Sequence, residues 1–184
     1  LCRYMDRKYE LALAAFKTAY QLDPLEEKAS ANQIRMLEEL GRWNEAEALI
    51  KSLSESILQS LKVRGAIARL LLSQQKLLQA AFEYKDLCEK APHDSVNWLN
   101  LAACLRGIHH THASKLVIKQ GLLRHPENED LKQAFGQALA GLGEHKQALK
   151  LLKQGIKNNN HKSKVHLFNL QFIGASYGLV SSKE

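Results

Sequence analysis

The fold of this chain is decided by residues 98–126, which read WLNLAACLRGIHHTHASKLVIKQGLLRHP. Small or apolar residues recur there at three- and four-residue intervals in two runs, namely Trp98, Leu101 and Leu105, and then Ser114, Ile118 and Gly121. Residues at these intervals lie on one face of an α-helix. The stretch therefore predicts two amphipathic helices joined by a short turn, and the second ends before Pro126 because proline cannot continue a helix.

The same pattern recurs with a period of 34 residues. Steps of this length from Pro24 reach Leu58, Pro92, Pro126 and Asn160, so that all three prolines fall in one column. A small residue recurs as Ala12, Ala46, Ala80, Ser114 and Ala148, and a large apolar one as Phe16, Ile50, Tyr84, Ile118 and Leu152. Two further columns are Leu37, Leu71, Leu105, Leu139 and Ile173, and Gly41, Gln75, His109 and Gly143, with a tight turn at the two glycines. Five aligned columns indicate a repeat protein.

Each period is predicted to hold an A helix and a B helix. The small column lets the two helices approach closely, and the large column fills the space between neighbouring repeats. No repeat can bury its apolar face alone, so stacking supplies the core. The expected helices are 8–22, 27–40, 43–57, 61–74, 77–90, 95–107, 111–124, 129–141, 145–158 and 163–176.

These residues resemble the tetratricopeptide repeat family. The first period resembles the second half of such a repeat in Tyr9, Ala12, Phe16, Ala19, Leu22, Asp23 and Pro24. The resemblance implies an all-α fold over residues 1–160, a right-handed α-solenoid (superhelix) of antiparallel helix pairs with a truncated first repeat. Residues 161–184 are expected to form a C-terminal capping helix and tail. The second repeat departs from the pattern, because Leu58 replaces proline and Gln33 and Ile34 replace the usual apolar–small pair.

The composition is that of a globular protein. Of the 184 residues, 45% are hydrophobic and 24% are charged, and no apolar run approaches the roughly 18 residues that span a membrane. Cys2, Cys88 and Cys104 fit neither a disulfide framework nor paired metal spacing, which favours reduced thiols in a cytoplasmic protein. The first residue is Leu1 rather than Met, so we expect a piece of a longer protein.

The resemblance implies a ligand site, because A helices of this family line a concave groove that holds a peptide. The polar residues that the repeat register places in the groove are Asn32, Arg35, Arg69, Asn100, Arg106, Gln133 and Gln137. Asparagine both donates to and accepts from a peptide backbone, and the arginine fork suits a carboxylate or phosphate. Of the carboxylate clamp of chaperone-binding members, only Asn100 is present. Of the asparagine ladder of O-GlcNAc transferases, only Asn32 and Asn100 are present.

Nothing in the sequence predicts catalysis, a cofactor or a metal site. His109, His110 and His112 lie in an expected turn with Arg106 close by and no nearby cysteine or carboxylate, which favours an exposed polar turn. No Gly-rich phosphate loop, Ser/His/Asp set or paired-carboxylate motif stands out. We therefore expect this chain not to be an enzyme.

The expected function is that of a scaffold that binds a peptide or protein segment in the groove. Repeat arrays of this type also commonly precede glycosyltransferase, sulfotransferase or methyltransferase domains in bacterial proteins. The alternative is therefore a non-catalytic arm that presents substrate to a larger enzyme.

The net charge of +7 is concentrated in residues 106–164, which hold 11 basic and 4 acidic side chains. Such a stretch suits an acidic partner, nucleic acid, or a solvated face, and the lack of interleaved aromatic residues argues against RNA. The apolar residues of 163–180 exceed what one helical face can bury. We expect this segment to cap the array and then dock on the remainder of the native chain or on a second copy, giving a homodimer.

Overall fold

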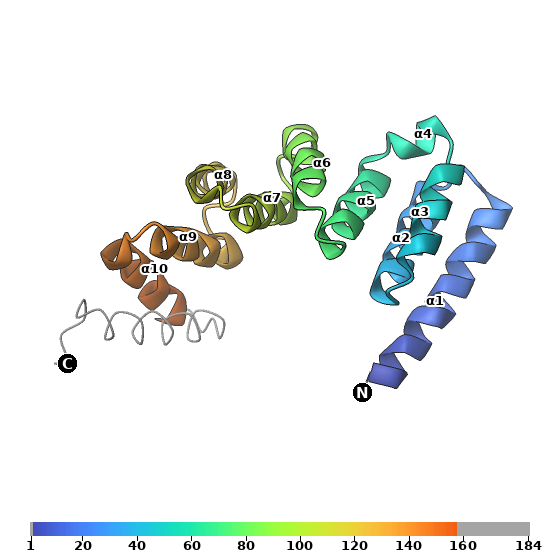
Figure 1. Cartoon of the computed structure of the whole chain (residues 1–184), viewed down its shortest axis with the longest axis horizontal. Coiled ribbons are helices and arrows are strands. Elements are labelled where there is room, and N and C mark those ends of the chain that lie inside the picture. The colour runs from blue at the N-terminus through green and yellow to red at the C-terminus, as the bar shows by residue number, and fades with distance from the viewer. Residues whose placement is uncertain (1, 158–184) are drawn as a thin grey trace. The chain divides into compact units, whose positions relative to one another are not determined.

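A computed structural model describes residues 2–157, which form helices and turns without a β-strand (Figure 1). The helices are α1 (Cys2–Leu22), α2 (Glu27–Glu39), α3 (Trp43–Ser52), α4 (Glu55–Leu58), α5 (Leu61–Ser73), α6 (Leu77–Lys90), α7 (Ser95–Gly107), α8 (Thr111–Arg124), α9 (Glu129–Gly141) and α10 (His145–Lys157). The predicted all-α fold is confirmed, and each helix from α5 to α10 ends within one residue of its prediction. The helix expected at 163–176 lies outside the described residues.

The chain divides into two compact units, Leu1–Ala91 and Pro92–Glu184. In the first unit, α2 packs against α1, α3 and α5, and α5 packs against α6. In the second, α9 packs against α7, α8 and α10, and α7 packs against α8. Helices α2, α5, α7 and α9 are the A helices of the repeats. Within each unit an A helix therefore contacts its own B helix and the A helix of the next repeat.

A left-handed residue ends each A helix and sets the turn into the B helix. The φ angle is 69° at Gly41, 60° at Gln75, 62° at His109 and 78° at Gly143. The next residue donates its N–H to the carbonyl five residues earlier, from Arg42 to Leu37, Lys76 to Leu71, His110 to Leu105 and Glu144 to Leu139, at 2.8–2.9 Å. The tight turn predicted at two glycines is thus present in all four repeats, because this bond holds glutamine and histidine in a conformation that glycine prefers.

The helix predicted at 43–57 is wrong in its second half. Helix α3 ends at Ser52, Leu53 is extended with ψ at 145°, and α4 begins at Glu55. Serine hydroxyls compete with the helix here, since Ser52 Oγ donates to a carbonyl of its own helix at 2.7 Å and Ser54 bonds Ser56. At the other end of the unit, α1 begins at Cys2 rather than at residue 8.

The small and the large apolar columns supply part of the core, although Ala12, Phe16 and Ile50 are only half-buried. The small-residue column is fully buried at Ala46, Ala80, Ser114 and Ala148. In the large column, Tyr84 and Ile118 are 2% and 0% exposed. Gln33, which replaces the usual apolar residue, is buried because its Nε2 donates to the carbonyl of Phe16 at 3.2 Å.

Candidate functional site

The candidate site lies on α7 and α9, the A helices of the second unit. Each begins at a side-chain cap. Asp94 accepts a hydrogen bond from the N–H of Val96 at 3.0 Å, and Asn128 accepts one from Leu131 at 2.9 Å. Such caps satisfy backbone donors that have no partner inside the helix, so both helices start at defined residues.

The two helices are joined near both ends. Near their first turns, Asn128 Nδ2 donates to Ser95 Oγ at 3.0 Å. Near their last turns, Arg106 Nη1 donates to Gln137 Oε1 at 3.1 Å. Helices α7 and α9 therefore run side by side in the same direction, and their inward residues face a common space.

That space is a hollow of about 300 Å³, which we call the α7–α9 pocket. Its lining consists of Leu99, Asn100, Ala102, Ala103, Arg106, Asp130, Gln133, Ala134 and Gln137. Three alanines leave the space, because their side chains are too short to fill the gap between two helix axes. The pocket brings together four of the seven predicted site residues, namely Asn100, Arg106, Gln133 and Gln137.

Two amides face this pocket, those of Asn100 and Gln133. Gln133 is only 9% exposed, and Asn100 is half-buried. Neither side chain makes a hydrogen bond to another residue in the part of the chain that the structure describes. A primary amide that makes no hydrogen bond within the protein is available to a ligand or to water.

Charges of opposite sign stand at the two ends of the pocket. Arg106 belongs to the last turns of α7, and no acidic side chain among residues 7–151 lies within 4.0 Å of its guanidinium. Asp130 belongs to the first turn of α9 and is exposed. The pocket therefore offers a carboxylate at one end, amides along its length, and a guanidinium at the other end.

Trp98 holds α7 in place behind the pocket. Its Nε1 donates to the carbonyl of Pro92 at 3.0 Å, and the guanidinium of Arg124 lies 5.1 Å from the ring centroid. Gly121 of α8 lies directly against it, since a Cβ there would sit 3.0 Å from the Cβ of Trp98.

Cys104, on the buried side of α7, is 0% exposed, and this burial raises the pKa of its thiol to about 11. The thiol is thus a packing group at neutral pH.

The other three predicted site residues lie on the first unit. Asn32 is half-buried and Arg35 is exposed, both on α2. Arg69 of α5 is half-buried and already paired within the first unit, because its Nε lies 2.8 Å from Glu38 Oε2 and its Nη2 pairs with Glu39. Burial acts to lower the pKa of Arg69, but the attraction of Glu38 and Glu39 outweighs it and raises the pKa. Sequence reasoning missed this pairing, although the 31-residue step from Glu38 to Arg69 is close to the repeat period.

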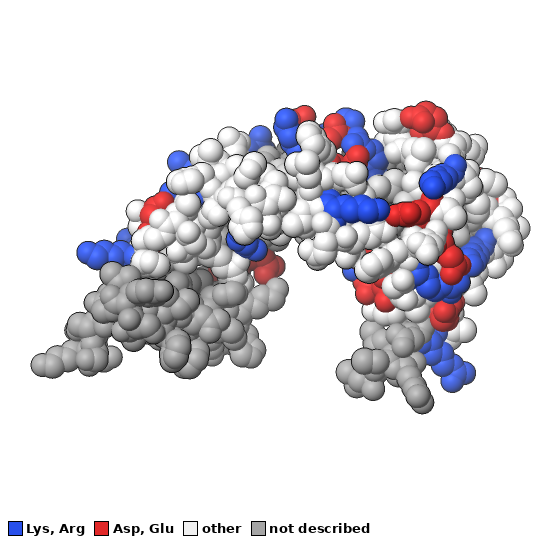
Figure 2. Space-filling model, in the orientation of Figure 1, with Lys and Arg blue, Asp and Glu red and all other residues white. Residues whose placement is uncertain are grey.

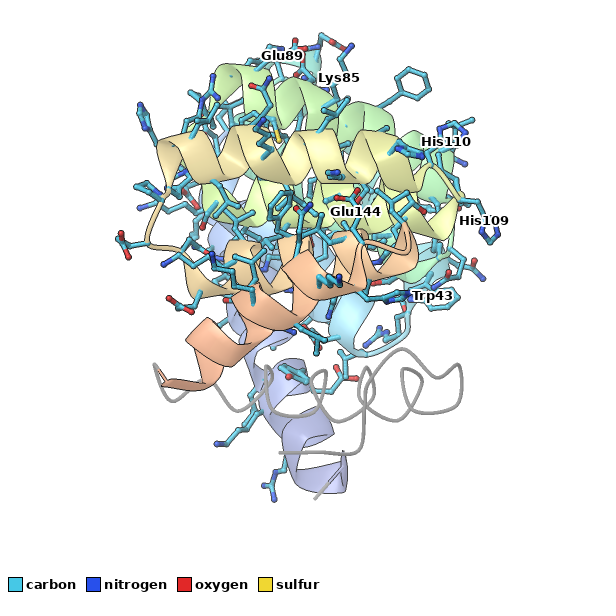
Figure 3. All side chains as sticks on the ribbon, turned by 90° about the vertical axis from the view of Figure 1, so that its left-hand side faces the viewer. Trp43, Lys85, Glu89, His109, His110 and Glu144 are labelled. Carbon is cyan, nitrogen blue, oxygen red and sulfur yellow. The ribbon has the colours of Figure 1, made fainter. Side chains whose placement is uncertain are left out.

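The histidine cluster does not gather around a common point. Figure 3 shows His109 and His110 projecting away from the helices at the turn between α7 and α8. Among the described residues, no group of three His, Cys, Asp or Glu side chains is placed to hold a metal ion. No helix in the same part of the chain is long and apolar enough to cross a membrane.

Comparison with known proteins finds a family match for the N-terminal part of the chain. Residues 4–70 match the sequence model of the tetratricopeptide repeat. No curated protein sequence matches the chain closely enough to count as a relative.

Solved structures of this family share the fold along most of the chain. TTC0263, a thermophilic protein of Thermus thermophilus, has a TM-score of 0.71 at 17% identity, covering 92% of this chain and 93% of that one. YrrB, a tetratricopeptide protein with an unusual peptide-binding site, has a TM-score of 0.68 at 16% identity and covers 89% and 84%. MamA from Desulfovibrio magneticus RS-1 has a TM-score of 0.68 at 15% identity and covers 84% and 91%. At these identities the likeness shows the fold.

Proposed function

We propose that this chain, whose residues 4–70 match the tetratricopeptide repeat, is a binding module for another protein, and that the α7–α9 pocket holds part of the bound segment. Folds of this type generally mediate protein–protein interaction. The observation that carries the proposal is Gln133, a residue that is 9% exposed and lines the pocket, and whose amide has no partner among the described residues.

The chemistry of the pocket fits an extended peptide. Each peptide group carries one donor and one acceptor, and the primary amides of Asn100 and Gln133 supply both. Beyond the amides, the fork of Arg106 suits an acidic side chain, and Asp130 suits a basic one. The bound segment in this proposal runs along the pocket with a basic residue towards Asp130 and an acidic residue towards Arg106. YrrB, whose fold is similar, has a peptide-binding site.

Selection from a displayed library of random peptides tests this proposal. The full chain is used as bait, and the affinity of each enriched peptide is then measured by fluorescence anisotropy. The Asn100→Ala and Arg106→Ala variants are expected to weaken binding about tenfold or more, since each removes a hydrogen bond and leaves its partner unsatisfied in the complex.

A matched control is Gln79→Ala. Gln79 is exposed on α6, in the first unit, and its loss also removes an amide. We expect the control to bind enriched peptides within a factor of two of the parent, and all variants to melt within a few degrees of it. Enriched peptides that bind both pocket variants as tightly as the parent would place the site elsewhere on the chain.

A further inference from the structure

Helix α1 leaves an apolar side exposed. In the first unit α1 packs against α2, and Figure 1 shows it at the edge of that unit. Leu11 and Leu22 are 66% and 84% exposed. Three alanines lie between them on the same side, because steps of three and four residues return to one side of an α-helix. We call this set the α1 face, and it consists of Leu11, Ala12, Ala15, Ala19 and Leu22.

The second unit shows what lies against this side of a B helix. The residues of α8 that stand three repeat periods after Ala12, Ala19 and Leu22 are Ser114, Gly121 and Arg124. Ser114 Oγ donates to the carbonyl of Ala102 at 2.8 Å. A Cβ on Gly121 would lie 3.0 Å from Trp98 Cβ, and the Arg124 guanidinium lies 5.1 Å from the centroid of the Trp98 ring. Both partners belong to α7, so this side of a B helix receives the A helix of its own repeat.

The same positions are closed in the other repeats and open in α1. The column of Ala12 is 0% exposed at Ala46, Ala80, Ser114 and Ala148, and the column of Ala19 is buried at Leu53, Leu87 and Gly121. Ala12 and Ala19 themselves are only half-buried, and Ala15 is exposed. Among residues 2–157, α1 has no A helix of its own repeat. The α1 face is therefore the exposed half of a helix pair.

Arg35 of α2 has no partner on the side of α2 that faces away from α5. It stands one repeat period before Arg69 of α5, which pairs with Glu38 of the preceding A helix at 2.8 Å. Arg35 itself is exposed, and no acidic side chain among residues 7–151 lies within 4.0 Å of its guanidinium. In Figure 2, by contrast, acidic and basic atoms lie next to each other over the part of the chain that holds α1–α5. A helix placed beside α2 as α2 lies beside α5 would bring an acid to Arg35.

We propose that the α1 face and Arg35 together form a docking surface, separate from the α7–α9 pocket, and that it takes one amphipathic helix of a partner protein. The helix lies against α1 as α7 lies against α8, and runs antiparallel to it. Its apolar residues cover the α1 face, which removes the exposed leucines from water. A carboxylate on the flank of the same helix pairs with Arg35.

The pairing of α7 with α8 sets the register of the bound helix. In α7, the large Trp98 lies against Gly121, the residue equivalent to Ala19. The small Ala102, four positions later, lies against the residue equivalent to Ala12. The partner helix therefore places a large apolar residue against Ala19 and, four positions later, a small residue against Ala12.

The repeat also sets the position of the acid. Glu38 of α2 stands eight residues after Ser30, which is equivalent to Trp98. The partner helix therefore carries its large apolar residue, its small residue and its acid at successive intervals of four, along one side. A second copy of this chain fits poorly, because residues 163–176, where the period would put the next A helix, contain no aspartate or glutamate.

A helical peptide tests this surface. It has the sequence of residues 95–107 with Arg106→Glu, which gives the proposed order of large, small and acidic residues. A lactam bridge between the positions of Val96 and Asn100, on the opposite side, keeps it helical, because free peptides this short are mostly unfolded in water. The control peptide exchanges the tryptophan and the alanine four positions later. By fluorescence anisotropy with the full chain, the first peptide is expected to bind at least about tenfold more tightly, since a large residue overpacks the contact at Ala12.

Two neighbouring alanines locate the bound helix. Ala15→Lys puts a charge into the α1 face and is expected to weaken the first peptide at least about tenfold. Ala14→Lys is the matched control, because Ala14 is also exposed but lies on another side of α1, and affinity should stay within about twofold of the parent. Both variants are expected to melt within a few degrees of the parent, since neither site is buried.

An exchange of charge tests the role of Arg35. Arg35→Glu should weaken the glutamate peptide about tenfold or more, and it should bind the peptide that keeps arginine at that position more tightly than the parent does. An Arg35→Glu variant that keeps the preference of the parent for glutamate would remove Arg35 from the surface.

Three further results would overturn the proposal. Equal binding of the first and the control peptide would mean that the face imposes no register. Equal losses in the Ala15→Lys and Ala14→Lys variants would place the peptide elsewhere on the chain. A dimer of the full chain, seen by analytical ultracentrifugation and lost in Ala15→Lys but not in Ala14→Lys, would mean that the face takes a second copy rather than a partner protein.

Discussion

The same substitution, glycine to alanine in the middle of a helix, is expected to have opposite effects at two positions. At Gly121 of α8, a new Cβ would lie 3.0 Å from Trp98 Cβ, 3.1 Å from Trp98 Cγ and 3.3 Å from Leu131 Cδ2. At Gly65 of α5, a new Cβ would have no neighbouring atom within 4 Å. Both substitutions raise the helix propensity by the same amount, and they differ only in the atoms that the new Cβ would contact.

The magnitudes follow from these contacts. Alanine in place of glycine favours a helix by about 1 kcal/mol, so Gly65→Ala should stabilise the protein by about 0.5–1 kcal/mol. At Gly121 the same gain is opposed by overpacking, which costs about 1–3 kcal/mol. The Cβ of Trp98 cannot rotate away, and its ring is tied to Pro92 and Arg124, so α8 itself must move. We expect a net loss of about 1 kcal/mol there.

Thermal unfolding followed by circular dichroism at 222 nm measures the difference. For a chain of this size, 1 kcal/mol corresponds to about 2–4 °C, so Gly65→Ala should melt about 3–8 °C above Gly121→Ala. The parent should melt between the two variants. If both variants melt above the parent by the same amount, α7 and α8 do not approach as closely at Gly121 as the structure has them.

Further predictions concern the turn, the core and the pocket. His109→Gly should raise the melting temperature by about 1–4 °C in the same assay, because glycine adopts the φ of 62° without strain. Ala80→Leu should lower the free energy of unfolding in urea by about 1–3 kcal/mol, since the site is fully buried. The pKa of Cys104 in the folded protein, about 11, lies above the ordinary thiol value of about 9, so the thiol ionises first in the unfolded chain as the pH rises. The free energy of unfolding should therefore fall between about pH 9 and 11, and it should fall less in the Cys104→Ala variant. Gln137→Glu should pair with Arg106 and weaken peptides with an acidic residue about tenfold by anisotropy; unchanged affinity would contradict the role given to Arg106.

The fold could be predicted from the sequence because its determinants repeat. The column that holds Ala80 reflects the close approach of two helices, and the column that holds Leu105 reflects the closure of the turn between them. Both requirements are local and recur every 34 residues. Where a local competitor intervenes, the periodicity misleads. The serines of 52–56 interrupt the helix expected at 43–57, and no repeat column records their hydrogen bonds.

The candidate site could be predicted only in part, because the repeat register gives the side of a helix on which a residue lies but not the residues with which it pairs. Register placed Asn100 and Gln133 on neighbouring A helices, and in the structure both line the α7–α9 pocket. It also placed Arg69 on the inner face of α5, where the structure shows its charge taken up by Glu38. Which polar groups stay unpaired depends on contacts between repeats, and these are set by residues about 30 positions apart.

One contact between repeats shows how the two units come to differ. In the first unit, Glu38 of α2 meets Arg69 of α5 across a 31-residue step, and in the second unit Arg106 of α7 meets Gln137 of α9 across the same step. The positions are equivalent but the chemistry is not. The first pair neutralises itself, whereas the second joins a cation to a neutral amide and leaves the charge in place. The same geometry thus gives an ion pair in the first unit and leaves a guanidinium at the end of the α7–α9 pocket in the second. The pocket is therefore better suited to an acidic group of a ligand than the equivalent place on the first unit is.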